Sequence, residues 1–139
     1  MSDTLRSVEI ERTGLGRYMA RNVRGGTLTM GGGDDPDFSP VELLLTAIGG
    51  CTAADVDYIT VKRAEPEKFT VTVSGDKIRD EQGNRMTNLT VEFAITFPDG
   101  EAGNAARDVL PKAVEMSHDR LCTVSRTVEL GAPIRNEIA

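Results

Sequence analysis

Alternating polar and apolar positions open the chain. Ser7–Arg12 shows this period of two, which is typical of a half-buried β-strand. Arg17–Val23 and Thr27–Met30 are further predicted strands, and turns that contain glycine separate the three segments. The first 30 residues therefore predict three short strands.

A helix is predicted after a loop rich in Gly, Asp and Pro. Ser39 is a favourable N-cap, Pro40 suits the first helical position, and Glu42 completes a capping box with Ser39. The helix is expected to end near Lys62 or Arg63, and from Leu43 to Ala54 it carries no charge on any side. A helix that is uncharged all round is surrounded by protein, which in a chain of 139 residues favours a partner subunit.

Two adjacent glycines interrupt this helix just before its cysteine. Each of Gly49 and Gly50 costs roughly 1 kcal/mol relative to alanine inside a helix. Such a pair indicates either the close approach of another backbone or a bend in the helix.

The second half of the chain predicts a hairpin, a helix and a last strand. Pro111 lies inside the predicted helix and indicates a kink or a later start. The whole order, βββ-α-ββ-α-β, predicts an α+β fold with a mostly antiparallel sheet, in one domain that spans residues 1–139. The predicted elements are a strand at Lys68–Ile78, a connection at Arg79–Asn84, a strand at Met86–Phe97, a helix at Asn104–Asp119 and a strand at Thr123–Glu129.

Composition and charge exclude several classes of function. The net charge of −6 provides no basic surface for phosphate groups, so neither nucleic acid nor an anionic membrane is an expected partner. The uncharged part of the first helix, Leu43–Ala54, is too short to span a bilayer, and the first 20 residues contain no apolar run of signal-peptide length. We therefore expect a cytoplasmic protein.

The two cysteines are the main candidates for chemistry. Cys51 lies in the uncharged helix and Cys122 follows the second predicted helix. A buried cysteine is commonly just a small apolar side chain, but two that meet in space form a candidate redox couple. Metal binding is not expected, because the chain has no Cys-x-x-Cys motif and His118 is its single histidine.

These residues resemble the OsmC/Ohr family of thiol-dependent hydroperoxide reductases. Residues 39–45 followed by Gly49–Cys51 are similar to the family's first-cysteine helix, Leu121–Arg126 to its second-cysteine motif, and Gly16–Arg17 to its N-terminal arginine loop. The family's glutamate commonly follows the proline directly and a proline follows the second cysteine. Here Val41 and Thr123 occupy those places, which indicates a divergent branch.

The resemblance implies a fold, an activity and a set of site residues. The fold is an OsmC-like intertwined homodimer, with the cysteine-bearing helices at its centre. Cys51 is then the peroxidatic nucleophile and Cys122 the resolving cysteine, while Arg17 supports the thiolate and Glu42 orients Arg17. The substrate is an organic hydroperoxide and the reductant an external dithiol or a lipoylated protein, with no metal, haem or flavin cofactor.

Each supporting residue also has a simpler interpretation. Arg17 competes with the neighbouring arginines of the same strands, and Glu42 completes the capping box. Asp55, four residues after Cys51, shares its helix face and would raise the thiol pKa unless it is paired. His118 is close enough in sequence to lower the pKa of Cys122, but equally suits a helix C-terminus. The expected apolar wall beside Cys51 consists of Leu44, Ala47, Ile48 and Tyr58.

Two other functions remain open. The first is a non-catalytic dimer that binds a small hydrophobic or thiol-reactive ligand, which the departures at Val41 and Thr123 favour. The second is a redox sensor in which a Cys51–Cys122 disulfide changes a partner surface. A cysteine pair that never oxidises would decide for the binding protein.

Overall fold

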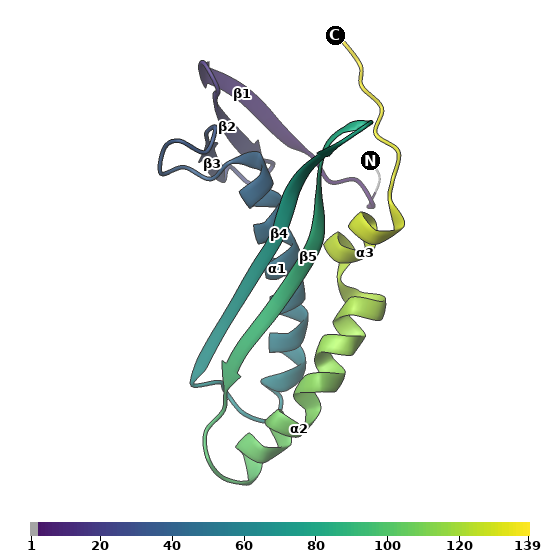
Figure 1. Ribbon diagram of the computed structural model, residues 1–139. Helices are drawn as coiled ribbons and strands as arrows, with labels where there is room; N and C mark the ends of the chain where they lie inside the picture. The colour runs from purple at the N-terminus through teal and green to yellow at the C-terminus, as the bar shows by residue number, and fades with distance from the viewer. Residues whose placement is uncertain (1–2) are drawn as a thin grey trace. The chain divides into compact units, whose positions relative to one another are not determined.

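The computed structural model describes residues 3–139 and divides into two compact units, residues 1–44 and 45–139. The boundary falls in the first turns of the long helix α1, so each unit is described by itself. Figure 1 shows the elements in chain order. They are β1 (Val8–Gly14), β2 (Arg17–Asn22), β3 (Thr27–Met30), α1 (Pro40–Thr60), β4 (Lys68–Asp80), β5 (Gly83–Thr96), α2 (Glu101–Met116), the π-helical turn η1 (Ser117–Leu121) and α3 (Thr123–Leu130).

The first unit is built on an antiparallel sheet in the order β1-β2-β3. Ile10 pairs with Ala20, and Ala20 with Leu28, so these side chains lie on one face of the sheet. Val8 and Tyr18, two positions from Ile10 and Ala20, share that face. Val8, Ile10, Tyr18 and Leu28 are exposed on this face, whereas Met30, which pairs with Tyr18, is buried.

The capping box predicted at the start of α1 is present. The Ser39 N–H donates to Glu42 Oε1 at 2.9 Å, and the Glu42 N–H donates to Ser39 Oγ at 3.3 Å. Leu43 N–H donates to the Ser39 carbonyl at 3.0 Å, which starts the helical ladder. The helix begins at Pro40 as expected and ends at Thr60, two residues before the expected end.

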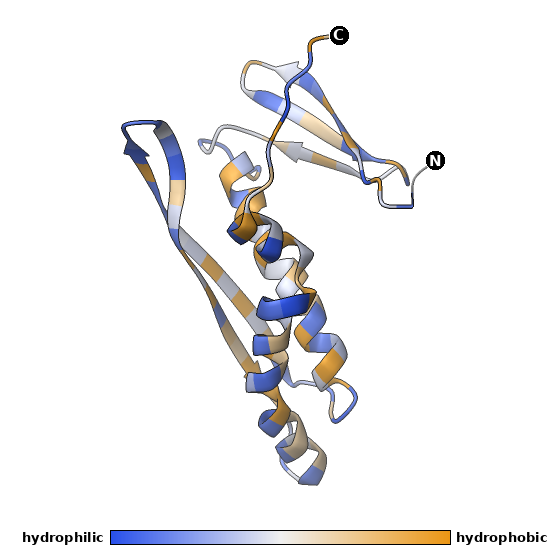
Figure 2. Ribbon diagram, turned by 90° about the vertical axis from the view of Figure 1, so that its right-hand side faces the viewer, coloured by the Kyte–Doolittle hydropathy of each residue, from blue (hydrophilic) through white to orange (hydrophobic). Residues whose placement is uncertain are grey.

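In the second unit a long two-stranded ribbon, β4–β5, lies along α1 (Figure 1). Figure 2 shows hydrophobic and polar positions alternating along both strands, as the sequence predicts. The connection is tighter than expected: Asp80 pairs with Gly83, and the Arg85 guanidinium donates to Asp80 at 2.7 Å. A β-carbon added to Gly49 would lie 2.5 Å from a methyl group of Val73, so α1 meets the side chains of β4, not another backbone.

The core of the second unit follows a single stripe of α1. Ile48, Thr52, Val56 and Thr60 are buried at intervals of four residues, and the Thr52 and Thr60 hydroxyls donate to carbonyls of the preceding turn. Cys122, Ala106 and Ala113 complete this core from the C-terminal helices. Gly49 is also buried, and the remaining residues of α1 are exposed or half-buried within this chain.

The C-terminal part departs from the sequence prediction. The second helix starts at Glu101 rather than Asn104 and contains Pro111. The strand predicted at Thr123–Glu129 is wrong: the segment is the helix α3. Its Thr and Val residues favour strands by propensity, but Cys122 caps the segment by accepting a hydrogen bond from the Ser125 N–H, and Gly131 ends it with a φ of 75°. Local capping outweighs propensity here.

The order of elements confirms the predicted α+β class with antiparallel strand pairing. Among residues 3–139, no helix combines the length and the apolar character needed to cross a membrane.

Candidate functional site

The two cysteines, 71 positions apart in the sequence, meet in the second unit. Cys51 projects from α1, and Cys122 lies at the junction of η1 and α3. Their sulfur atoms and a carboxylate oxygen of Asp55 all lie within 4.8 Å of one another. Both thiols are free; Cys51 is half-buried and Cys122 fully buried.

A π-helical turn places Cys122. Its N–H donates to the Ser117 carbonyl five residues earlier, at 2.8 Å, and its own carbonyl accepts the Arg126 N–H at 3.0 Å. The chain therefore turns at Cys122 from one helical segment into the next. Its side chain points inward as the N-cap of α3.

Hydroxyl and amide groups surround the Cys122 sulfur. The thiol lies 3.1 Å from Ser125 Oγ and accepts the Ser125 N–H at 3.4 Å. The Thr52 hydroxyl lies between two acceptors, the Ile48 carbonyl at 3.0 Å and Cys122 Sγ at 3.3 Å. If Cys122 loses its proton, both hydroxyls are placed to donate to the thiolate.

These surroundings move the two thiol pKa values in opposite directions. Burial raises the pKa of Cys122, but hydrogen bonds from Ser125 and Thr52 more than offset it, so the pKa lies below its ordinary value. Burial raises the pKa of Cys51, and the backbone N–H groups of Val124 and Thr123 only partly compensate, while Cys122 raises it further. In the reduced pair, the thiolate is therefore favoured at Cys122 and the thiol at Cys51.

The carboxylate of Asp55 has a hydroxyl partner. The buried Ser117 Oγ donates to Asp55 Oδ2 at 2.8 Å. An unpaired carboxylate here would raise the pKa of the Cys51 thiol, and the natural partner for it is a cation. The charge is instead met by a neutral donor, and Asp55 is not among the groups that raise the pKa of Cys51.

His118 joins η1 to α3. Its Nε2 lies 2.8 Å from Glu129 Oε1 and its Nδ1 3.0 Å from Asp119 Oδ1. Hydrogen bonds to Asp119 and then to Glu129 raise the pKa of His118 above its ordinary value. The ring is not among the groups that set the pKa of Cys122. His118 thus tethers the helix that Cys122 caps.

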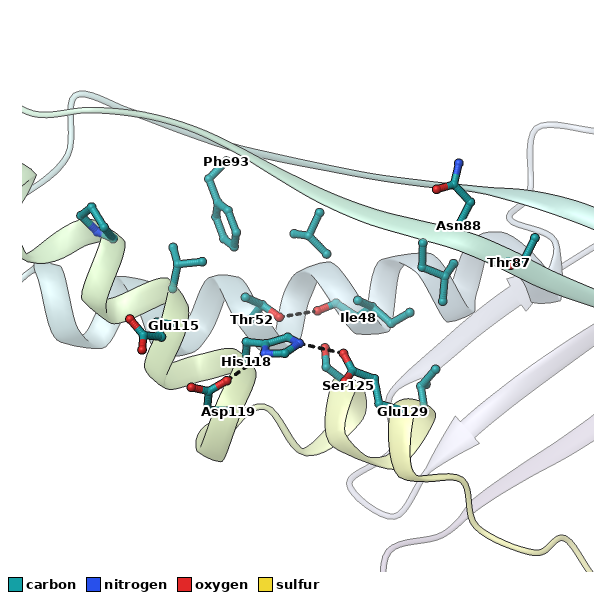
Figure 3. Close-up of a pocket in the computed structure, with 15 residues that line it drawn as sticks. Ile48, Thr52, Thr87, Asn88, Phe93, Glu115, His118, Asp119, Ser125 and Glu129 are labelled. Atoms are coloured by element: carbon teal, nitrogen blue, oxygen red, sulfur yellow. Dashed lines mark hydrogen bonds and ion pairs between the residues drawn. The ribbon is translucent and has the colours of Figure 1, made fainter.

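A cavity of about 750 Å³ is lined in part by Thr52 and Ser125, whereas neither cysteine is among its lining residues. Figure 3 shows Ile48 and Thr52 of α1 facing it from one side, and His118, Ser125 and Glu129 from the C-terminal helices. Thr52 and Ser125, whose hydroxyls contact the Cys122 sulfur, therefore also face the cavity. Apolar residues line it from α1, β5, α2 and α3, and all of its acidic residues lie on the C-terminal helices. The apolar lining consists of Ile48, Leu89, Val91, Phe93, Pro111, Val114 and Val128, and the acidic lining of Glu115, Asp119 and Glu129.

The wall expected from helical spacing is largely different from this lining. Ile48 lines the cavity as expected. Leu44 and Tyr58 are exposed on α1, with Tyr58 at 74%, and neither they nor Ala47 belong to the lining. Apart from Ile48, the apolar lining comes from β5, α2 and α3, which spacing along a single helix does not reveal.

Arg17 and Glu42 lie in the first unit. The Arg17 guanidinium forms ion pairs with Asp35 and, at 2.8 Å, with Asp37. The Glu42 carboxylate accepts the Ser39 N–H of the capping box. Two loop aspartates are thus partners of Arg17 that the sequence analysis did not single out.

Sequence reasoning also missed Thr52, Ser117 and Ser125 as polar partners of the site. Ser125 lies three residues after Cys122, the spacing at which a capped helix returns a donor to its N-cap. That spacing could have predicted Ser125 from the sequence. No spacing predicts Thr52 or Ser117 as partners, because their contacts depend on which helices pack together.

Comparison with known proteins places the chain in a family. The sequence model described as OsmC-like protein matches residues 31–137. An uncharacterized protein of Mycobacterium tuberculosis is 30% identical over 131 residues, which cover 93% of each chain. The structure of an OsmC-like protein of unknown function from Vibrio cholerae has a TM-score of 0.74 at 16% identity, covering 93% of this chain and 95% of that one. The organic hydroperoxide resistance protein OhrB of Bacillus subtilis has a TM-score of 0.57 at 12% identity, with coverage of 91% and 92%.

Proposed function

We propose that this chain, which belongs to the OsmC-like family, reduces organic hydroperoxides with Cys51 and Cys122. The observation that carries the proposal is the convergence of the two sulfurs within 4.8 Å. Thr52 and Ser125, which contact Cys122 Sγ, also line a cavity with a partly apolar wall. Similarity to a protein named for organic hydroperoxide resistance supports the same activity.

In the first step Cys51 acts as the nucleophile, because it is the more accessible thiol. In its thiolate form, which its lowered pKa favours, Cys122 takes the proton of Cys51. The Cys51 thiolate then attacks a peroxide oxygen, the S–O bond forms, and the O–O bond breaks. The alkoxide leaves and is protonated to an alcohol, and Cys51 is oxidised by two electrons to a sulfenic acid.

In the second step Cys122 resolves the sulfenic acid. Its sulfur attacks Cys51 Sγ, the S–S bond forms, and hydroxide leaves and is protonated to water. The lowered pKa of Cys122 suits this role, because hydrogen bonds from Ser125 and Thr52 stabilise its thiolate. An external dithiol or a lipoylated protein then reduces the disulfide and returns both thiols.

The lining of the cavity favours organic over hydrogen peroxide. Apolar side chains of β5 and α2 bury a hydrocarbon group at about 25 cal/mol per Å² of apolar area. Hydrogen peroxide offers no such area. The carboxylates of Glu115, Asp119 and Glu129 further favour peroxides without a negative charge.

A homodimer is part of the proposal. The sheet of the first unit exposes Val8, Ile10, Tyr18 and Leu28 on one face, with Val8 and Ile10 more than half exposed. An apolar sheet face of this kind requires a cover in solution. Sedimentation equilibrium is expected to give twice the mass of the chain. Ile10→Asp is expected to shift that equilibrium toward monomer.

Arg17 and Glu42 remain predicted site residues. Their assignment comes from the family resemblance, and the ion pairs of Arg17 with Asp35 and Asp37 orient its guanidinium within the first unit. Arg17→Gln is expected to slow the reaction of Cys51 with peroxide. Arg24→Gln, in the turn that follows β2, is the control.

The test is a time course of free thiols in reduced protein mixed anaerobically with one equivalent of cumene hydroperoxide. Wild type is expected to lose both thiols rapidly. Cys51→Ser should lose none, and Cys122→Ser should yield a sulfenic acid that a dimedone-type reagent traps. The proposal is wrong if both thiols persist for minutes while a control peroxidase reacts at once.

The cavity also favours a second function, the binding of a small apolar ligand without turnover. Its volume of about 750 Å³ lies within the range of small-molecule pockets. This function predicts that an apolar fluorescent probe binds, and that Phe93→Ala weakens the binding. It replaces the peroxidase assignment if both thiols survive the peroxide.

A further inference from the structure

Cys51, Asp55 and Cys122 form a set of metal-ligating atoms that the sequence did not predict. Cys51 and Asp55 are one helical turn apart on α1 and share a face, while Cys122 approaches from the η1–α3 junction. The two sulfurs and the carboxylate oxygen lie within 4.8 Å of one another. In a tetrahedral zinc site with Zn–S bonds of about 2.3 Å, neighbouring donor atoms are roughly 3.5–3.8 Å apart. The upper limit on the separation of the three atoms is therefore about 1 Å wider than this spacing.

Two of the three donors, Asp55 and Cys122, have neighbours that orient them. Ser117 Oγ donates to Asp55 Oδ2 at 2.8 Å, and the carboxylate keeps further acceptor capacity for a cation. Thr52 Oγ1 and Ser125 N–H lie at 3.3 and 3.4 Å from Cys122 Sγ. Supporting hydrogen bonds of this kind fix ligand geometry in metal sites and are worth about 10–100-fold in affinity.

The donor set also selects the kind of metal. Two thiolates and one carboxylate suit a borderline-soft cation, while Mg²⁺ and Ca²⁺ require six or more oxygen ligands. Three protein ligands leave the fourth tetrahedral position to water. The N-terminus of α3, which follows Cys122 directly, helps to offset the negative charge of the ligands.

We propose that reduced Cys51, Asp55 and Cys122 bind Zn²⁺, with a water molecule as the fourth ligand. Both thiols lose their protons to solvent as the two Zn–S bonds form. A disulfide uses the same two sulfurs, so metal binding and oxidation are mutually exclusive. The binding itself does not depend on peroxide turnover. Its consequence, that Zn²⁺ blocks the peroxidase reaction, rests on the proposed function.

The test is an anaerobic titration of the reduced full chain with Co²⁺, a spectroscopic substitute for zinc. We expect one Co²⁺ per chain, a thiolate-to-cobalt charge-transfer band, and displacement of that band by Zn²⁺. Cys51→Ser and Cys122→Ser should each abolish the two-thiolate spectrum, and Asp55→Asn should weaken binding at least tenfold. Asp57→Asn, an exposed carboxylate on the same helix, is the matched control and should bind like wild type.

A second measurement avoids the possibility that a variant fails to fold. Wild type with its cysteines joined in a disulfide should bind no Co²⁺ until it is reduced. The inference is overturned if the reduced chain gives no charge-transfer band, if Cys51→Ser keeps the band, or if the oxidised chain binds equally well. If the chain binds Co²⁺ but does not reduce the peroxide, the metal site stands and the proposed activity is wrong. If it reduces the peroxide but binds no Co²⁺, the proposed activity stands and the metal site is wrong.

Discussion

The glycine pair before Cys51 offers a direct test of how α1 is positioned. A β-carbon on Gly49 would lie 2.5 Å from Val73 Cγ2 and 3.6 Å from Val71 Cγ1, whereas one on Gly50 meets no atom of the described chain within 4 Å. The first contact is too short for a real β-carbon, and valine is stiff about χ1, so β4 or Val73 has to move. Gly49→Ala therefore places a methyl group against Val73, and Gly50→Ala does not.

The magnitudes follow from two opposing effects. Alanine in place of glycine stabilises a helix by about 1 kcal/mol, and both variants gain that amount. Overpacking typically costs about 1–3 kcal/mol, and Gly49→Ala alone incurs it. Gly50→Ala is thus expected to be about 1 kcal/mol more stable than wild type, and Gly49→Ala to be about 1–3 kcal/mol less stable than Gly50→Ala.

Urea denaturation followed by circular dichroism measures both values, at one protein concentration because association shifts apparent stability. Adding Val73→Ala to Gly49→Ala removes the colliding methyl group, and the double-mutant cycle should show favourable coupling. If Gly49→Ala proves as stable as Gly50→Ala, the contact between α1 and β4 is not as described, and the placement of Cys51 is in question.

Three further predictions concern the site. In reduced, chelator-treated protein, Cys122→Ala is expected to lower the pKa of Cys51, because Cys122 raises it; alkylation rate against pH measures this. By NMR, the pKa of His118 is expected to lie above its ordinary value of 6.5, and Glu129→Gln is expected to lower it. The stability that the protonated His118 gains from these carboxylates is fully present below pH 6.5 and is lost as the pH rises through the folded-state pKa. A fatty-acid hydroperoxide is expected to react several-fold to tenfold more slowly than its methyl ester. The reason is that the repulsion between the substrate carboxylate and a carboxylate of the cavity costs about 1 kcal/mol near 4 Å in water. Glu115→Gln should make the two reaction rates more alike.

Local signals in the sequence predicted most of the elements correctly. The capping box at Ser39 located the start of α1, and alternation located β4 and β5. The failure at Thr123–Glu129 has a definite cause, since β-branched residues favour strands while the cap at Cys122 is a single side-chain interaction that propensity does not register. Helix boundaries at Gly100 and Thr60 were missed by only a few residues.

The site was predictable in its cysteines and not in its surroundings. Cys51 and Cys122 stand out by residue type and by the family resemblance. The partners that tune them come from different elements: Thr52 from α1, Ser117 from η1 and Ser125 from α3. A sequence shows that such hydroxyls exist, but only the packing of α1 against η1 and α3 shows which of them reach a sulfur.

The surroundings of the two sulfurs also account for their division of labour. Cys122 is fully buried and has hydroxyl and amide donors around it, so it holds a thiolate that a peroxide reaches with difficulty. Cys51 is half-buried and its pKa is raised, which favours its thiol form. In the proposed reaction, the proton of Cys51 moves to Cys122 before attack and leaves Cys122 again before resolution. The proposed division of labour makes Cys51 the sulfur that cleaves the peroxide and Cys122 the sulfur that completes the disulfide.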